Sequence, residues 1–363
     1  MWTVISAVQN DRWMACLDKA GRYDVYHLPG YHLAYEKETP ARAHAYVAEI
    51  GGETLFHPIM LRPIDVVGDA PAPKGLYDAE SVYGYAGPVA STDDPDFLAE
   101  AWRGYEDWCS ERGVVCEFTR FNPMLGNHML AARGATVWRD RATVAINLGQ
   151  GEDGLWAGYT SPQRNRVRKA LKGGLECVER PVAEGLNAFR RLYEQTMDNL
   201  GADAFYHFSG SYYETLIAAL GDRVRPFVVA QGDDDLAAAL FFLHGTTIHY
   251  HLGGSSSEHR HLAPNNLLFH EVARWAISRG LKEFHLGGGR GPEPDDSLLR
   301  FKSGFSPVRH DMYFGKQIFD SAAYDRLVSL WLDQAGSDVR PAYFQLYRLD
   351  PRQGGRAGRD AAA

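Results

Sequence analysis

The segment 226–289 reads PFVVAQGDDDLAAALFFLHGTTIHYHLGGSSSEHRHLAPNNLLFHEVARWAISRGLKEFHLGGG. Its apolar runs Phe227–Ala230, Ala238–Leu243 and Ile248–Leu252 are rich in β-branched and aromatic residues, and the turn-forming sequences GDDD and HGTT separate them. This pattern predicts three consecutive antiparallel strands that form a meander.

A helix and a fourth strand are predicted next. After the loop around Pro264, apolar residues recur at helical spacing, and Gly280 ends the predicted helix. These apolar residues are Leu267, Leu268, Val272, Trp275 and Ala276. The short strand Glu283–Leu286 then runs into the glycine cluster Gly287–Gly289. Glycines at a strand exit let another backbone or a ligand approach closely.

The first half of the chain repeats this order. Strands are predicted at Tyr46–Ile50, Thr54–Pro63, near Tyr83 and at Val114–Phe121, with a hairpin turn at Gly51-Gly52, a helix at Leu98–Arg112 and a short helix at Leu125–Arg133. Trp108–Gly113 (WCSERG) matches Trp275–Gly280 (WAISRG), and 83–91 resembles 250–256. Chance similarity is the competing explanation, but the common order favours an internal duplication. The predicted domains are 1–150 and 151–335, with a partly disordered extension at 336–363.

Composition limits the classes of protein. With 363 residues, 45% hydrophobic and 23% charged, the chain is typical of a globular protein. No apolar run reaches the ~20 residues of a membrane span, and MWTVISAVQNDRW does not resemble a secretory leader, so we expect a cytoplasmic protein. The four cysteines show no zinc-binding spacing, and no metal site is predicted. The net charge of −8 argues against a coat of nucleic acid but allows a local basic patch.

A basic helix is predicted where the halves join. Ser161 is a plausible N-cap with Pro162 at the first helical position, and basic residues follow at helical spacing. Arg164, Arg168 and Lys172 share one face, and Arg166 and Lys169 flank them. Two interpretations stay open: a solvated face paired with nearby carboxylates, or an anion site for phosphates or an RNA backbone.

These features together resemble the Fem family of aminoacyl-tRNA-dependent transferases, which have two tandem domains of the Gcn5-related N-acetyltransferase (GNAT) type. The matching pieces are Arg164–Ala170, Leu262–Leu268, Gly287–Arg290 and Phe301–Phe305 (FKSGF). The resemblance implies an α/β (α+β) fold in which each domain has a mixed, largely antiparallel sheet with flanking helices. Segment 187–220 has no room for the coiled-coil arm of the staphylococcal members, so the chain resembles the armless type.

The resemblance also implies a reaction. Aminoacyl-tRNA would donate an amino acid to the amine of a nucleotide-linked peptidoglycan precursor or of a small metabolite, in cell-wall or antibiotic biosynthesis, with no cofactor. Lys302 would stabilise the oxyanion or bind the tRNA 3′-end phosphate, and Phe301 would position the terminal adenosine or the lysine stem.

Further residues are assigned to substrate by the resemblance. Tyr250, His251, Arg290 and Tyr206 would contact the acceptor or its phosphate, and Tyr83 and Tyr85 are their counterparts in the first half; Arg164, Arg168, Lys169 and Lys172 would bind tRNA. Packing roles for the tyrosines and an ion pair of Arg290 with Asp295 or Asp296 are the alternatives. His251 could act as general base, although no Asp or Glu is clearly placed to orient it.

Two other functions remain open. An acyl-CoA-dependent N-acyltransferase could use the same halves, but the loop His259–Asn266 contains no glycine, and Pro264 lacks the amide hydrogen that would help hold a pyrophosphate. The other open function is that of a non-catalytic binding module. The amphipathic segment Ser321–Gln334 is predicted to pack on the second half or on a partner.

Overall fold

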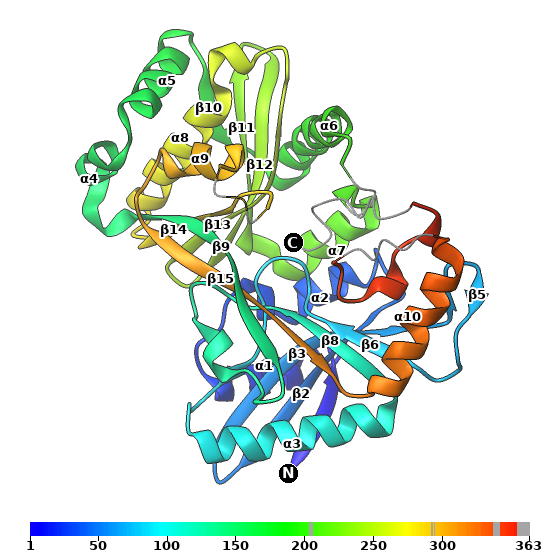
Figure 1. Ribbon diagram of the computed structural model, residues 1–363. Helices are drawn as coiled ribbons and strands as arrows, with labels where there is room; N and C mark the ends of the chain where they lie inside the picture. The colour runs from blue at the N-terminus through cyan, green and yellow to red at the C-terminus, as the bar shows by residue number, and fades with distance from the viewer. Residues whose placement is uncertain (203–205, 292, 294, 337–341, 354–363) are drawn as a thin grey trace. The chain divides into compact units, whose positions relative to one another are not determined.

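The protein divides into two compact units. The structure, a computed structural model, describes residues 1–363 apart from 203–205, 292, 294, 337–341 and 354–363 (Figure 1). Unit 1 comprises Met1–Asp140 and Asp311–Ala363, and unit 2 comprises Arg141–His310. The division departs from the predicted boundaries at 150 and 335, because the chain passes from unit 1 to unit 2 along β9 (Thr136–Asn147) and back along β15 (Arg309–Ile318).

Unit 1 is a twisted sheet covered by helices on both faces. Its strands are β1 (Trp2–Ser6), β2 (Arg42–Ile50), β3 (Glu53–Pro63), β4 (Val66–Val67), β5 (Ala70–Pro71), β6 (Tyr77–Glu80), β7 (Val89–Ala90) and β8 (Val114–Arg120), and its helices are α1 (Asn10–Ala20), α2 (Pro29–Tyr35), α3 (Pro95–Arg112) and α10 (Ser321–Ala335). The main sheet has the order β1-β2-β3-β6-β8-β15. All its printed pairings are antiparallel except β6 with β8.

The alternation of side chains along β3 shows which helix covers each face of this sheet. His57 of β3 contacts the rings of Trp102 and Tyr105 on α3, whereas its neighbour Phe56 contacts Trp13 on α1. Because successive side chains of a strand point to opposite faces, α3 and α1 cover opposite faces of the sheet.

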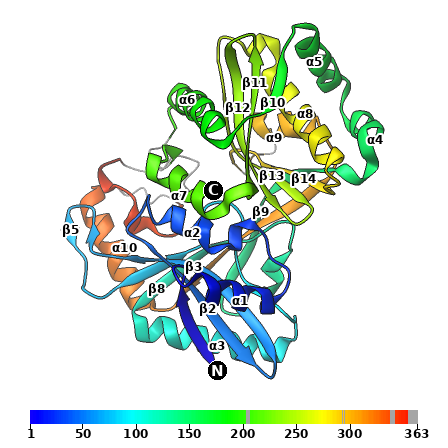
Figure 2. The same cartoon turned by 180° about the vertical axis from the view of Figure 1, so that it is seen from behind.

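Unit 2 has the same plan. Its strands are β10 (Glu176–Glu179), β11 (Val224–Gln231), β12 (Asp234–His244), β13 (Thr247–Ser255) and β14 (Glu283–Gly288), and its helices are α4 (Gly151–Gly158), α5 (Ser161–Lys172), α6 (Val182–Leu200), α7 (Gly210–Leu220), α8 (Pro264–Ser278) and α9 (Ser297–Ser303). The sheet order is β9-β14-β13-β12-β11-β10, with α8 and α6 on opposite faces (Figures 1 and 2). Phe241, Phe269 and Phe284 pack together between the sheet and α8.

The predicted meander and the duplication are confirmed. β11, β12 and β13 pair antiparallel in sequence order, and β14 pairs parallel to β13, as β8 pairs parallel to β6. The matched motifs end α3 and α8, and Gly113 and Gly280 both have φ of 74°, a conformation that favours glycine. The two sheets therefore have equivalent strand orders, each completed by an antiparallel strand that links the units along the chain.

Three local predictions were wrong. The strand predicted near Tyr83 is β6, which ends at Glu80. Tyr83 itself lies in a bend, where its carbonyl accepts from the Tyr31 hydroxyl at 2.9 Å, and an isolated bridge forms at Ala86. The helix predicted at Leu125–Arg133 is a 3-10 turn at Asn127–Leu130, because Asn122 caps the following amides through its side chain. The N-cap of α5 is Thr160 rather than Ser161.

The C-terminal segment belongs to unit 1, so of its two predicted places, on the second half or on a partner, the first was wrong. Tyr324, Leu327 and Trp331 of α10 pack with Val115 of β8 and Leu346. Residues 342–353 continue along the same unit, whereas the remaining parts of the predicted extension, 337–341 and 354–363, lie outside the described residues. Across the described residues, no helix has the length and apolarity to cross a membrane.

Candidate active site

The exit of β14 and the start of α9 form one side of the candidate site. Asp296 is the N-cap of α9, since its carboxylate accepts from the Leu299 amide at 2.7 Å, and it also accepts from the Arg290 amide at 3.1 Å. A Cβ on Gly289 would overlap this carboxylate. Glycine is therefore required where the strand turns back toward α9, which agrees with the predicted close approach at the cluster Gly287–Gly289.

Lys302 lies on α9 and reaches back to this strand exit. Its side chain is 5% exposed, its Nζ donates to the Gly288 carbonyl at 2.8 Å, and it lies 5.4 Å from the Tyr250 ring centroid. Burial lowers the pKa of Lys302 from 10.5 to about 7; Asp296 opposes this shift and Arg141 adds to it. Both the ammonium and the neutral amine are thus populated near pH 7.

A second buried cation, Arg141 of β9, lies at the same strand exit. It is 6% exposed and its Nη1 donates to the Gly289 carbonyl at 3.2 Å. Successive carbonyls of the glycine cluster thus hold Lys302 and Arg141, and the two cations concentrate positive charge there. The sequence analysis missed Arg141, because nothing in its local sequence, RDRAT, signals a site; only the pairing of β9 with β14 brings it there.

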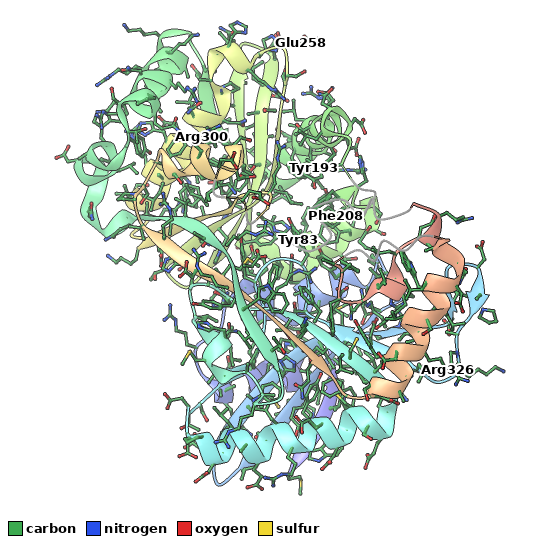
Figure 3. The ribbon with its side chains drawn as sticks, in the orientation of Figure 1. Tyr83, Tyr193, Phe208, Glu258, Arg300 and Arg326 are labelled. Atoms are coloured by element: carbon green, nitrogen blue, oxygen red, sulfur yellow. The ribbon has the colours of Figure 1, made fainter. Side chains whose placement is uncertain are left out.

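Phe301 faces the core of unit 2 rather than an open surface. Its ring is half-buried, 5.6 Å from the Phe269 ring and 5.4 Å from the Phe305 ring. The predicted role of Phe301, to position the terminal adenosine or the lysine stem, stays a prediction. Arg300, the preceding residue, is exposed (Figure 3).

A buried amide pair joins α9 to the basic helix α5. Gln163 of α5 donates to the Phe301 carbonyl at 2.8 Å and accepts a hydrogen bond from Asn266 of α8. The Thr160 amide donates to the Gly304 carbonyl at 2.9 Å. The start of α5 is therefore fixed directly to the FKSGF segment. Neither residue was singled out in the sequence, although Asn266 lies inside one of the segments that carried the resemblance and Gln163 directly precedes another.

Tyr250 and His251 lie on opposite faces of β13, so the structure does not bring both to Lys302. Tyr250 packs edge-on against Phe269 at 4.9 Å. His251 stacks on Phe242 at 4.1 Å, and its Nε2 is 3.2 Å from the Tyr212 hydroxyl. Burial lowers the pKa of His251 to about 3, so the imidazole is neutral at pH 7.

The remaining predicted substrate contacts are dispersed. Arg290 is exposed, and its amide, rather than its guanidinium, is the group that meets Asp296. Tyr206 is half-buried beside the undescribed residues 203–205, close in sequence to Phe208 (Figure 3), which stacks on Tyr212. Tyr83 and Tyr85 belong to unit 1, where Tyr83 stacks on Tyr35 at 6.4 Å and Tyr85 meets Tyr26 edge-on at 5.3 Å.

The basic helix α5 divides its cations between two tasks. Arg164 turns inward and donates to the carbonyls of Tyr159 and Trp156, so it fixes the end of α4. Arg168 lies 5.1 Å from the Trp156 ring, and Lys169 and Lys172 are exposed. Among the described residues, no carboxylate lies within ion-pair distance of these four cations. The exposed cations are therefore not neutralised by ion pairs with the described carboxylates.

The loop before α8 has a distinctive backbone. Ala263 has φ of 60°, and it is the one non-glycine with positive φ among the described residues; Pro264 follows as the first residue of α8. The side chain of Asn265 donates to the Ser255 hydroxyl at 3.0 Å. This helix start thus carries a Cβ and a proline ring where a pyrophosphate would need a bare backbone with amide donors.

Comparison with known proteins agrees with this architecture. Residues 161–302, which include α5, α8 and Lys302, match the family profile described as an acetyltransferase (GNAT) domain. No curated protein matches the sequence. The crystal structure of FemX matches with a TM-score of 0.65 at 16% identity, over 90% of this chain and 99% of FemX.

Two further solved structures share the fold. The structure of L-PGS from Bacillus licheniformis matches with a TM-score of 0.55 at 13% identity, over 89% of this chain and 96% of that one. A tandem GNAT protein from the clavulanic acid biosynthesis pathway matches with a TM-score of 0.52 at 12% identity, over 88% of this chain and 98% of that one. The predicted resemblance to Fem-type tandem GNAT proteins is confirmed at the level of fold, and the GNAT profile supports acyl transfer as the reaction class.

Proposed function

We propose that this tandem GNAT-fold chain is an aminoacyltransferase, which moves an amino acid from aminoacyl-tRNA to the amine of an acceptor and forms an amide bond. The observation that carries the proposal is the buried Lys302 at the glycine-rich exit of β14, with Arg141 on the next carbonyl. The proposed acceptor is a nucleotide-linked peptidoglycan precursor or a small metabolite, and the use of charged tRNA would place the reaction in the cytoplasm.

The reaction requires stabilisation of a developing negative charge. The acceptor amine attacks the ester carbonyl of the aminoacyl-tRNA, a C–N bond forms, and the carbonyl oxygen becomes an oxyanion. When the C–O bond breaks, the terminal ribose oxygen leaves and takes up a proton, while the amine loses one. The Lys302 ammonium donates to the oxyanion, and the charge of Arg141 adds to its stabilisation. An anion beside Lys302 also raises the pKa of the lysine, so the charged form is favoured in the transition state.

The donor is inferred from α5. Its exposed cations, Arg168, Lys169 and Lys172, have no ion-pair partners among the described residues, and phosphates are the anions that such a surface binds. The same helix holds the FKSGF segment through Gln163 and Thr160. A polyanion bound along α5 would therefore lie on the element that fixes Lys302.

An acyl-CoA-dependent N-acyltransferase is the second candidate, and the acetyltransferase profile matched by 161–302 favours it. The start of α8 argues against it. Ala263 and Pro264 occupy the turn where coenzyme A would need exposed amides, and Pro264 has no amide hydrogen.

The test combines binding with transfer. Calorimetry at one moderate salt concentration, with charged tRNA and separately with acetyl-CoA, is expected to show binding of tRNA alone; salt is fixed because phosphate contacts make affinity steeply salt-dependent. Transfer from labelled aminoacyl-tRNA to candidate amines should fall at least ~100-fold in Lys302→Ala, the effect expected when one oxyanion donor is removed.

Lys302→Arg is the matched control, because it keeps the charge but alters the donor geometry and the ability to titrate near pH 7. Saturable acetyl-CoA binding with no response to tRNA would replace the proposal with the second candidate. Transfer that persists within a few-fold in a folded Lys302→Ala protein would contradict the role of Lys302.

A further inference from the structure

β1 forms one edge of the sheet. It pairs with β2 over Trp2–Ser6, and no other strand in the described part of the chain pairs with its outer side. The strand reads WTVIS, with no charged residue and no proline, and its pairing with β2 has no register shift. Charged residues, proline and bulges are the usual devices that keep a strand edge from pairing with another chain. β1 has none of the three.

The strand at the other end of the sheet order is protected in this way. β10 pairs with β11, and two of its four residues are glutamates, Glu176 and Glu179. Glu179 accepts from the Arg225 guanidinium and from the Trp275 indole, both at 3.0 Å. A copy of β10 laid along this edge would bring like charges together, which destabilises a strand pair. Of these two edges, β1 is therefore the one that permits self-pairing.

The hydrogen bonds between β1 and β2 show which backbone groups face outward. The Ala7 amide donates to the Ala43 carbonyl at 3.0 Å, in the same register as the rest of the pairing. Because alternate residues of an antiparallel strand bond to a given neighbour, the odd-numbered residues of this segment bond to β2. The residues whose amides and carbonyls face outward are therefore Trp2, Val4 and Ser6.

Two of these three residues have free backbone groups. The Gln9 amide donates to the Ser6 carbonyl at 2.9 Å, and the Ser6 amide donates to the Gln9 side chain at 3.1 Å, so Ser6 is satisfied. The described residues supply no hydrogen-bond partner for the outward amides and carbonyls of Trp2 and Val4. Their side chains are also incompletely covered, since Trp2 is 39% exposed and Val4 is half-buried.

We propose that β1 is an interface at which two copies of this chain associate, through antiparallel pairing of their β1 strands about a two-fold axis at Thr3. In this register Trp2 of each copy lies opposite Val4 of the other. Each of these two pairs exchanges two backbone hydrogen bonds, so the outward amides and carbonyls of Trp2 and Val4 are satisfied in both copies.

The reason to commit to a second copy is that this edge is complementary to itself. An aromatic residue opposite a β-branched residue stabilises an antiparallel pair, and the register sets Trp2 against Val4 twice. Thr3 meets Thr3 of the second copy, which is another favourable cross-strand pair. Because β1 contains no residue of the candidate active site, the inference does not depend on the proposed function.

Sedimentation equilibrium of the full chain measures the association. A dimer is expected with a dissociation constant on the order of 10–100 µM, as suits a small interface. The Arg12 guanidinium donates to the Thr3 hydroxyl at 3.1 Å, so two arginines would approach the axis. Salt at about 0.3 M screens their repulsion and is kept constant.

Two substitutions of Val4 test the interface. Val4→Pro removes an outward amide hydrogen and leaves the bonds of Thr3 and Ile5 to β2, an orientation in which a strand edge tolerates proline. It should raise the dissociation constant at least about tenfold, because symmetry removes two hydrogen bonds of the dimer. Val4→Lys places a charge on the edge and should act in the same direction, which keeps the test valid if Val4→Pro fails to fold. Val66→Lys is the control, since Val66 is an exposed valine elsewhere in unit 1 and should leave the association unchanged.

A cysteine at position 3 tests the register. In the proposed dimer the two Thr3 residues form a non-hydrogen-bonded pair with Cα atoms about 4.5 Å apart, which is within the range of a disulfide. Thr3→Cys should therefore form an intermolecular disulfide under a mild oxidant. Val4→Cys should not exceed the wild-type background, because Val4 is offset by two positions from Val4 of the second copy.

Three outcomes would overturn the proposal. The first is a monomer up to about 0.5 mM, well above the expected dissociation constant. The second is a dimer whose dissociation constant changes less than about twofold in a folded Val4→Pro or Val4→Lys protein, against the loss expected from the missing hydrogen bonds. The third is a dimer in which Thr3→Cys forms no more disulfide than the wild type, which would place the interface elsewhere on the chain.

Discussion

The two units bury charge in opposite ways. In unit 1, Asp78 is fully buried between Arg62 and Arg348, whose Nε atoms lie 2.8 and 2.9 Å from its carboxylate oxygens. In unit 2, Lys302 is almost as deeply buried, but it meets the Gly288 carbonyl, and among the described residues no carboxylate lies within ion-pair distance of it.

This difference separates a structural charge from a reactive one. The two guanidinium groups offset the burial of Asp78 and hold its pKa below the ordinary value, so it stays ionised. No ion pair among the described residues offsets the burial of Lys302, and its pKa falls to the range in which proton transfer and oxyanion binding occur at neutral pH. A buried, unpaired cation destabilises the fold, which is why such a group points to function.

The largest effect is expected from Lys302→Met. The fall of the Lys302 pKa from 10.5 to about 7 corresponds to an upper limit of about 5 kcal/mol of destabilisation below pH 7. Between pH 7 and 10.5 the unfolded state binds more protons, so wild-type stability rises with pH. Lys302→Met should therefore be more stable than wild type at pH 6, and the advantage should shrink toward pH 10.5, as measured by urea unfolding. A destabilised variant at pH 6 would show that the charge is compensated.

Asp78→Ala should instead lower the free energy of unfolding. The substitution leaves Arg62 and Arg348 buried without their shared carboxylate, which costs about 3–5 kcal/mol. Because Arg348 lies in the C-terminal segment, limited proteolysis should also cut that segment faster. Asp350→Ala, which removes the ion pair and the backbone hydrogen bond that Asp350 makes with the exposed Arg352, is the control and should change stability little. If the two substitutions lower the free energy of unfolding by similar amounts, the interpretation of Asp78 as a structural charge would be contradicted.

A smaller effect is expected from Gln163→Leu. The substitution removes the amide that donates to the Phe301 carbonyl, and the free energy of unfolding should fall by about 1–3 kcal/mol. Looser packing of α9 should expose Lys302 and raise its pKa toward 10.5, measured by the pH dependence of its acetylation with acetic anhydride. Gln231→Leu is the matched control, since Gln231 holds the Gly173 carbonyl at the other end of α5. If both variants shift the titration of Lys302 equally, Gln163 has no specific role in positioning it.

The smallest effect is expected from Ala263→Gly. Ala263 has φ of 60°, where an L-residue is strained and glycine is not, so the free energy of unfolding should rise by up to about 1 kcal/mol. Ala276→Gly in the interior of α8 should instead lower it by about 1 kcal/mol or more. Thermal unfolding at pH 7 measures both, and a destabilised Ala263→Gly protein would argue that the turn is not strained.

The sequence predicted the parts of the fold that depend on local pattern. Hydrophobic periodicity located the meander and α8, and the matched glycines, Gly113 and Gly280, revealed the duplication. The motif also drew attention to Lys302, whose catalytic role stays a prediction. Its burial could not be predicted, because a lysine in a short polar helix is usually solvated.

The sequence could not predict contacts made across long separations. Arg141 is brought to Gly289 by strand pairing over 148 positions, and Arg348 meets Asp78 over 270. The buried hydrogen bond between His57 and Glu117 joins residues 60 positions apart, and each looks unremarkable in its own strand. Tyr250 and His251 were grouped because they are adjacent, but the alternation of a strand sends them to opposite faces.

The route of the chain through β9 and β15 has a consequence for biosynthesis. Unit 2 is one continuous segment, so all its strands are available as soon as residue 310 has left the ribosome. Unit 1 must wait for β15 to cover β8 and for Arg348 to reach Asp78. We therefore expect unit 2 to fold before unit 1, the reverse of the usual order in which the N-terminal domain folds first. Until β15 has been synthesised, β8 in the nascent first half has an open strand edge.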